Sequence, residues 1–194
     1  VDMSEVIDRS LERVRRRRND IEFDVQVIPW QVYADSSGLA RAVLNLMDNA
    51  AKWSPSGGSV GIRMTQLSPT HAELVVSDHG PGIPLHERGL VFERFFRSAT
   101  ARAMPGSGLG LAIVKQVVLK HGGALRVEDT VPGGHPPGTS IYVLLPGRPI
   151  PVAPHPAPWT DAPDARDAGA DPNRGNSPGP ASVISVDSQT TQAR

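Results

Sequence analysis

The stretch Asp78-His79-Gly80-Pro81-Gly82-Ile83 follows directly on a predicted strand, Ala72 to Ser77. Its glycines permit positive φ angles and let another group come close to the backbone. A carboxylate at a strand end, beside an apolar Ile83, can accept a hydrogen bond from the exocyclic amine of adenine, which guanine lacks at that position. Taken alone, the stretch is better interpreted as a common Asp-x-Gly turn. The segments on either side decide between the two interpretations.

A second glycine-rich stretch, Gly106-Ser107-Gly108-Leu109-Gly110-Leu111, comes immediately before the body of a predicted helix, Leu109 to His121. The N-terminal amides and the dipole of a helix favour a phosphate group at that position. A dinucleotide-binding fold would require a preceding strand within a βαβ unit, and a polar, arginine-rich loop precedes the glycines instead. A Walker-type loop is excluded, because no Lys-Ser or Lys-Thr follows the glycines.

The segment between the two glycine stretches has the composition of a hinged lid. It begins with Phe92-Glu93-Arg94-Phe95-Phe96-Arg97 and continues with small residues from Ser98 to Pro105. At least one of the phenylalanines is expected to pack in the core. Arg97 and Arg102 are candidates to neutralise phosphate charge, because a flexible loop over a phosphate site is where cationic side chains would do so.

Upstream, the segment Ser36 to Trp53 carries apolar residues at helical spacing and predicts a helix. Asn45 and Asn49 lie four residues apart and therefore share one face, and Lys52 follows near that face one turn later. Amide oxygens are suitable ligands for Mg²⁺, and a lysine is a suitable point charge for a phosphate. The N-x-x-x-N-x-x-K pattern alone describes many polar surface helices.

The remaining periodicities complete the prediction of an α+β domain. A helix is predicted at Met3 to Arg18, with its basic last turn, Arg15 to Arg18, expected to be a solvated face that suits the helix dipole. The predicted strands lie at Ile21 to Val27, from Val32 and Tyr33, Val60 to Thr65, Ala72 to Ser77, Leu125 to Glu128 and Thr139 to Leu145. We therefore expect a two-layer α/β sandwich, in which about three helices cover one face of a mixed, mostly antiparallel sheet of about five strands.

Composition limits the classes of partner. Twenty Lys and Arg balance 20 Asp and Glu, so no general attraction to nucleic acid or to an anionic membrane is expected. No cysteine occurs, which fits a reducing cytosolic setting. No apolar run approaches the roughly 20 residues that cross a bilayer, so no direct membrane contact is expected.

From Pro146 onward the composition changes to Pro, Ala, Asp, Gly and Ser, and Lys and Glu are absent. Such a segment cannot bury enough apolar surface to offset its chain entropy. We expect a folded domain at residues 1–146 and a disordered tail at residues 147–194.

The order of the four motifs resembles that of the catalytic domain of bacterial two-component sensor histidine kinases. The asparagine helix, the Asp-x-Gly-x-Gly turn, the Phe-Arg lid and the Gly-x-Gly-x-Gly loop are similar to the N, G1, F and G2 boxes of that family. The resemblance covers residues 1–146, and it implies the Bergerat fold that the family shares with gyrase, Hsp90 and MutL. It also implies binding of ATP and Mg²⁺.

The resemblance assigns roles to single residues. Asn49 would ligate Mg²⁺ with support from Asn45, Lys52 would contact a phosphate, and Trp53 would stack near the adenine. Asp78 would accept the adenine amine, with Thr139 sharing a water, while Arg97 and Arg102 would reach the γ-phosphate. The other expected nucleotide-binding residues belong to the two glycine stretches: Gly80, Gly82, Ile83, Gly106, Ser107, Gly108, Leu109, Gly110 and Leu111.

Asn45 favours phosphoryl transfer over hydrolysis. Hydrolases that share this fold carry a Glu there to activate water, and an amide cannot act as that base. No histidine of the chain lies in a His-Glu/Asp-x-Arg/Lys-Thr/Ser-Pro segment of the kind that such kinases phosphorylate; the six are His71, His79, His86, His121, His135 and His155. The phosphoacceptor histidine is therefore expected in a separate dimerisation domain upstream of Val1.

The resemblance also implies the wider setting. The parent would be a homodimeric sensor kinase anchored in the inner (plasma) membrane, with this part in the cytoplasm as a monomeric domain, and a response regulator would receive the phosphoryl group. Two alternatives stay open. One is a nucleotide-sensing module without transfer activity, and the other is a serine kinase of the anti-sigma type.

Overall fold

The described part of the computed structural model, residues 1–102, 104 and 106–151, is built on one five-stranded sheet. The strand order is β1-β3-β4-β6-β5. The strands span Glu22–Gln26 (β1), Ser59–Ser68 (β3), His71–Asp78 (β4), Ala124–Glu128 (β5) and Thr139–Pro146 (β6). β1 runs parallel to β3, and the other neighbouring pairs are antiparallel. The predicted mixed, mostly antiparallel sheet is therefore confirmed.

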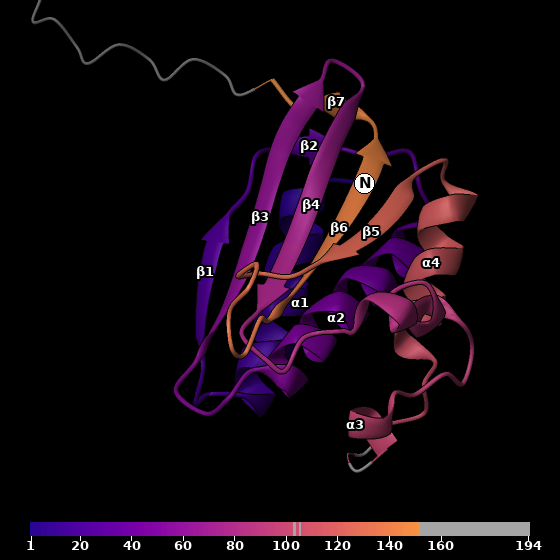
Figure 1. Cartoon of the computed structure of the whole chain (residues 1–194). Helices are drawn as coiled ribbons and strands as arrows, with labels where there is room; N and C mark the ends of the chain where they lie inside the picture. Colours follow the sequence, from indigo (N-terminus) through magenta and orange to yellow (C-terminus); the bar gives the residue numbers. More distant parts are fainter. Residues whose placement is uncertain (103, 105, 152–194) are drawn as a thin grey trace, which may run out of the picture. The chain divides into compact units, whose positions relative to one another are not determined.

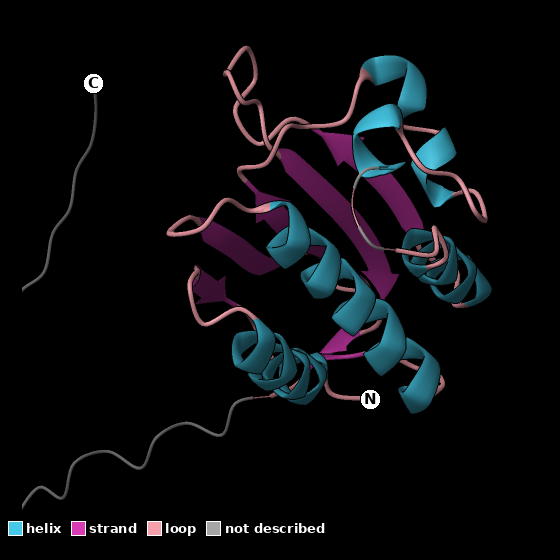
Figure 2. Cartoon of the chain, turned by 90° about the horizontal axis from the view of Figure 1, so that it is seen from below, coloured by secondary structure: helices cyan, strands magenta, loops and turns pink. Residues whose placement is uncertain are grey.

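Three helices cover one face of this sheet (Figures 1 and 2). They are α1 (Met3–Arg17), α2 (Ser36–Trp53) and α4 (Gly110–Lys120). α2 is central, since it packs against α1, α4 and β4. This arrangement confirms the two-layer sandwich, and it places the asparagine helix beside the helix that follows the second glycine stretch.

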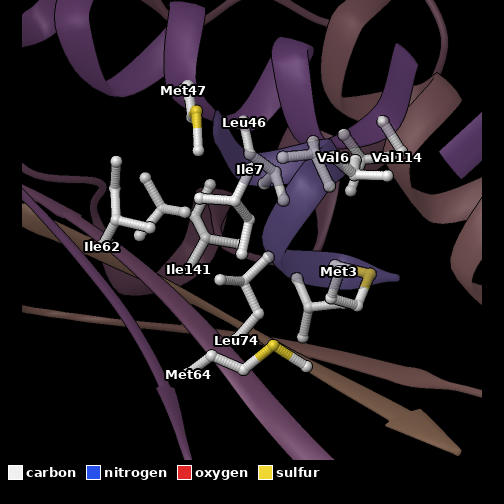
Figure 3. Close-up of a cluster of buried hydrophobic side chains, with 14 of the residues drawn as sticks. Met3, Val6, Ile7, Leu46, Met47, Ile62, Met64, Leu74, Val114 and Ile141 are labelled. Carbon is white, nitrogen blue, oxygen red and sulfur yellow. The ribbon is translucent and has the colours of Figure 1, made fainter. Parts of the chain in front are cut away.

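The core lies between the two layers (Figure 3). Alternate residues of β3 and β4 are buried, as expected for strands with one covered face. Their side chains meet apolar residues from all three helices and from β6. Prominent members of this core are Ile7, Leu46, Met47, Ile62, Met64, Leu74, Val114 and Ile141. Because α2 contributes its apolar face to the core, its opposite face is left for Asn45 and Asn49.

A small second sheet joins β2 (Trp30–Gln31) to β7 (Arg148–Pro149) in antiparallel fashion. The short strand expected from Val32 thus lies two residues earlier, at the fully buried Trp30. Trp30 and Gln31 pair with the segment after β6, and that long-range pairing sets the strand bounds. The boundary at residue 146 and the disordered tail stay predictions, and residues 152–194 lie outside the described residues.

Short helical turns occupy the region between the two glycine stretches. They are η1 (Leu85–Glu87), η2 (Leu90–Phe92) and α3 (Ala99–Arg102). Of the expected core phenylalanines, Phe92 is buried, whereas Phe95 is exposed. None of the helices in the described ranges has the length and apolar character needed to span a bilayer.

Candidate nucleotide-binding site

A pocket of about 290 Å³ lies where the four motifs meet. Its lining comes from the C-terminal half of α2, the turn after β4, the short turns that follow it, the lid, the second glycine stretch with the start of α4, and the start of β6. Thirteen of the expected site residues are among the lining residues: Asn45, Asn49, Lys52, Trp53, Gly82, Ile83, Arg97, Gly106, Ser107, Gly108, Gly110, Leu111 and Thr139. Four others, Asp78, Gly80, Leu109 and Arg102, do not line it directly.

The polar face of α2 forms one wall of this pocket. The helix begins at a well-formed cap, because the Asp35 carboxylate accepts hydrogen bonds from the Ser37 and Gly38 amides at 3.3 and 2.9 Å. Near its other end, the Asn45 amide donates to the Gly110 carbonyl at 3.3 Å. This bond joins the asparagine helix to the second glycine stretch, and it leaves the Asn45 side-chain oxygen as an acceptor.

Lys52 lies at the meeting point of α2 and the lid. Burial lowers the pKa of this lysine, and the nearby charge of Arg97 lowers it further. A Cβ atom on Gly106 would lie 3.1 Å from the Lys52 ammonium nitrogen, so a residue with a side chain would crowd this position. Lys52 and Arg97, next to a glycine backbone without a side chain, make a suitable place for an anion such as a phosphate.

Asp78 lies behind the pocket, at the end of β4. Its side chain is buried, and its Oδ1 accepts hydrogen bonds from the backbone amides of Gly80 at 2.9 Å and Thr139 at 3.2 Å. Burial raises its pKa to about 6, while the two amide donors oppose that rise. Within the described ranges no donor reaches Oδ2, so this oxygen is left for a ligand amine.

The glycine positions have separate structural causes. Gly80 lies against the end of α2, where a Cβ atom would be 2.7 Å from the Trp53 carbonyl oxygen. Gly108 combines a φ of +71° with a Cβ position only 2.9 Å from the backbone of Phe95 and Phe96. A hydrogen bond of 3.0 Å from the Phe95 amide to the Gly108 carbonyl joins the lid to the second glycine stretch at the same place. The base of the lid can therefore pack on the second glycine stretch only where side chains are absent.

The two lid arginines differ in position. Arg97 lines the pocket, but its guanidinium donates to the carbonyls of Ala101 and Met104 and so folds back onto the lid. Arg102 is exposed and lies outside the pocket lining. An ion pair of 2.7 Å between Lys115 and Glu93 links the lid to α4. Contact of Arg97 with a γ-phosphate would require its guanidinium to leave these carbonyls, and the roles of both arginines stay predictions.

Sequence reasoning missed several pocket residues: Asp48, Pro81, Pro84, Glu87, Val91, Phe96, Ser98 and Ala101. Asp48 could have been found from helical spacing, because it lies three residues after Asn45 on the same helix. The two prolines lie within or beside the first glycine stretch. Glu87 belongs to η1 and Val91 to η2. The sequence of these short turns has no clear periodicity that would show which side chains face inward.

The donor set fits a magnesium nucleotide better than a metal held by protein alone. Among the residues described, no group of three or more His, Cys, Asp or Glu side chains could hold a metal ion. Mg²⁺ is commonly held by one or two protein oxygens together with substrate phosphates and waters. The amide oxygens on α2, opposite a glycine-rich helix start, match that pattern.

The residues that line the pocket all lie within the part of the chain that matches a known protein family. Residues 34–149 match the family described as histidine kinase-, DNA gyrase B- and HSP90-like ATPases. Over 201 aligned residues, the whole chain is 70% identical to the signal transduction histidine-protein kinase/phosphatase MprB of Mycobacterium avium (strain 104). The chain covers 38% of that relative, and so spans well under half of its length.

Two solved structures have the same architecture. The mycobacterial sensor histidine kinase MprB is similar with a TM-score of 0.74 and 73% identity, over 77% of this chain and 97% of that one. Full-length ShkA in complex with AMPPNP is similar with a TM-score of 0.64 and 27% identity, over 78% of this chain and 31% of that one.

Proposed function

The chain belongs to the family of histidine kinase-, DNA gyrase B- and HSP90-like ATPases, and on that premise we propose that it is the phosphoryl-donor domain of a sensor histidine kinase. It binds Mg-ATP and donates the γ-phosphoryl group to a histidine of a separate dimerisation and phosphoacceptor domain. That domain then passes the group to a response regulator. The identity of 70% to a kinase/phosphatase named for signal transduction supports this assignment.

One observation carries the proposal: Asn45, Asn49 and Lys52 on α2 face the second glycine stretch across a single pocket. The hydrogen bond from Asn45 to the Gly110 carbonyl fixes this pairing. In the proposed complex, Asn49 and Asn45 hold Mg²⁺, and Lys52 contacts a phosphate. The amides at the start of α4 supply further donors for the phosphates.

The opposite end of the pocket selects the base. Asp78 accepts the adenine amine, the Thr139 backbone amide bonds to the same carboxylate, and Trp53 and Ile83 contribute apolar surface. Mg²⁺ held by Asn49 and Asn45 would neutralise charge on the phosphates. Guanine carries an oxygen in place of that amine, so Asp78 disfavours it.

The transfer breaks the bond between the γ-phosphorus and the β–γ bridging oxygen, and it forms a phosphorus–nitrogen bond to the acceptor imidazole. ADP leaves, and the imidazole proton passes to a base of the acceptor domain. The amide of Asn45 cannot activate a water as a general base. We expect the domain to hold ATP for transfer, with slow hydrolysis.

The proposed setting is a homodimeric sensor kinase anchored in the plasma membrane, in which this domain is cytoplasmic and monomeric by itself. The experiment mixes the chain with γ-labelled ATP, Mg²⁺ and the separately prepared acceptor domain of its parent protein. Acid-labile phosphohistidine on the acceptor domain is the expected product. Tight ATP binding without any transfer would instead indicate a nucleotide-sensing module, and acid-stable phosphoserine would indicate a serine kinase.

A further inference from the structure

Arg18, directly after α1, contacts the C-terminal end of the asparagine helix. Its guanidinium donates to the Ala51 carbonyl, and at 3.2 Å to the Ser54 carbonyl. The last four carbonyl groups of a helix have no partner within the helix. Arg18 therefore stabilises the end of α2, although it is more than 30 residues away along the chain. This contact differs from the solvated face expected for Arg15 to Arg18.

Asp20 holds the same guanidinium in place from the other side. The Arg18 Nε and one terminal nitrogen donate to the two Asp20 carboxylate oxygens at 2.7 and 3.0 Å. The bidentate bonding to Arg18 lowers the pKa of Asp20 to about 2, with further help from Ser56. A planar guanidinium can join one carboxylate and two carbonyls at once, which a lysine ammonium cannot do with fixed geometry.

The segment between the two bonded carbonyls belongs to the nucleotide pocket. Lys52 and Trp53 lie between Ala51 and Ser54, and both line the pocket. On the side of β4, the Trp53 carbonyl and Cβ lie so close to Gly80 that an added Cβ there would be 2.7 and 3.0 Å away. The last turn of α2 is thus held between Arg18 and the first glycine stretch.

A neighbouring ion pair strengthens the connection between the two helices. Arg17 donates to the Asp48 carboxylate at 2.9 Å, and Asp48 lines the pocket one turn before Lys52. Because the Arg17 side chain is 63% exposed, this pair contributes little energy by itself. The more enclosed Arg18 is the main contact between α1 and the pocket end of α2.

We propose that Arg18 is a positioning residue for nucleotide binding: by bonding the Ala51 and Ser54 carbonyls, it fixes the last turn of α2 and so places Lys52 against the phosphates. The inference rests on the proposed function, because it deepens the role given to Lys52. Arg18 itself touches neither the nucleotide nor the acceptor histidine.

The test measures the dissociation constant of Mg-AMPPNP for Arg18→Met, with Arg16→Met as the matched control. Arg16 is an exposed cation in the last turn of α1, so its loss changes the charge equally without removing these bonds. Arg18→Met is expected to weaken binding by at least about threefold, since charge-assisted hydrogen bonds are lost at the turn that carries Lys52. Arg18→Lys is expected to recover only part of the affinity.

A double-mutant cycle separates positioning from a general loss of structure. In a Lys52→Ala background, Arg18→Met is expected to change the affinity by less than about twofold. Circular dichroism confirms that each variant is folded at the assay temperature. If Arg18→Met does not fold, Asp20→Asn replaces it in the same cycle, because it removes the negative charge and one of the two acceptor oxygens that orient the guanidinium.

Two results would overturn the inference: affinity of Arg18→Met equal to that of Arg16→Met, or the same loss with and without Lys52. Failure of the proposed function looks different, because the unmodified chain would then either not bind Mg-AMPPNP or bind ATP without passing label to the acceptor domain.

Discussion

Two ionisable side chains of the site have pKa values displaced toward their neutral forms. Burial raises the pKa of Asp78 to about 6, and burial together with Arg97 lowers the pKa of Lys52. Such displacements are common at binding sites, because a bound ligand can stabilise the ionised form of a buried group. An adenine amine would do so for Asp78, and a phosphate for Lys52. Nucleotide binding is therefore expected to lower the pKa of Asp78 and to raise that of Lys52.

The displaced pKa of Asp78 predicts how stability depends on pH. Its pKa is about 6 in the folded protein against 3.8 as the reference value, so the unfolded chain loses this proton first. Its contribution to the free energy of unfolding is full below about pH 4 and falls by roughly 3 kcal/mol as the pH rises through 6. Asp78→Asn should remove this decline.

Urea unfolding at pH 4.5 and 7.5 measures the free energy of unfolding of Asp78→Asn and of the unmodified chain. The difference between the two proteins at each pH cancels the contributions of the other titrating groups. Asp78→Asn should gain stability relative to the unmodified chain on going to pH 7.5. An unchanged difference between the two pH values would show that Asp78 is ionised normally in the fold.

The proposed role of Asn49 as a ligand of Mg²⁺ predicts a magnesium-dependent effect of its substitution on nucleotide affinity. Asn49→Ala should weaken AMPPNP binding by at least about tenfold with Mg²⁺ present, because an oxygen ligand of the ion is lost. In excess EDTA the two proteins should bind alike. Calorimetric titration measures both conditions, and Asn19→Ala, at an exposed asparagine outside the pocket, is the control. An equal loss in both conditions would exclude Asn49 as a metal ligand.

At the scale of elements, the pocket depends on how α2 is held at its two ends. Its start is capped by the Asp35 side chain, whose own backbone amide donates to His121 at 3.2 Å. Its end is bonded by Arg18 and lies against Gly80. The lid is attached to α4 through Lys115 and to the second glycine stretch at Gly108. We expect substitutions at these attachments to reach the pocket without changing a nucleotide contact.

The cap of α2 gives the first prediction at this scale. Asp35→Ala should lower the free energy of unfolding by about 1 kcal/mol, because two amides of the first turn lose their acceptor. The affinity for nucleotide should change little, since the first turn of α2 does not line the pocket. Urea unfolding measures the effect, and Asp35→Asn should restore most of the stability. Equal stability of Asp35→Ala and the unmodified chain would disprove the role of the cap.

The attachment of the lid to the second glycine stretch gives the second prediction at this scale. Gly108→Ala should lower both stability and nucleotide affinity, because the new Cβ would clash with the backbone of Phe95 and Phe96 in addition to the strain of a positive φ. Gly133→Ala is the matched control, since Gly133 has a φ of +75° with nothing within 4 Å of the added Cβ. That control should show only the strain of about 1 to 2 kcal/mol.

Thermal unfolding and AMPPNP titration of both variants separate the effect of backbone strain from the effect of the clash with the lid. If Gly108→Ala matched Gly133→Ala in stability and affinity, the contact between the lid and the second glycine stretch would have no role in binding.

At the scale of the whole molecule, motif order predicted more than local periodicity did. It placed Asn45 and Gly110 in one site, although 65 residues separate them, and the structure brings these two into contact. Period-two alternation correctly indicated β1, but the bounds of β2 depend on a pairing with β7 near the other end of the domain. Local patterns do not contain such long-range pairings.

Hydrogen bonds from arginine side chains to backbone carbonyls were the least predictable contacts. Arg18 binds the carbonyls at the end of α2, and Arg97 binds those of its own lid. Both are long, flexible and compatible with solvent, so their type and spacing do not reveal which carbonyls they meet. The fold and most of the pocket lining could therefore be predicted, whereas the contacts that hold the pocket in shape could not.

Phosphoryl transfer to the acceptor domain tests the central claim most directly. Incubated with γ-labelled ATP and Mg²⁺, the chain should place acid-labile, base-stable label on the acceptor histidine, while Asn49→Ala should give none above background. Little free phosphate should be released without the acceptor, because Asn45 cannot activate water. Rapid hydrolysis with an unlabelled acceptor would contradict the account, and would make the domain an ATPase rather than a phosphoryl donor.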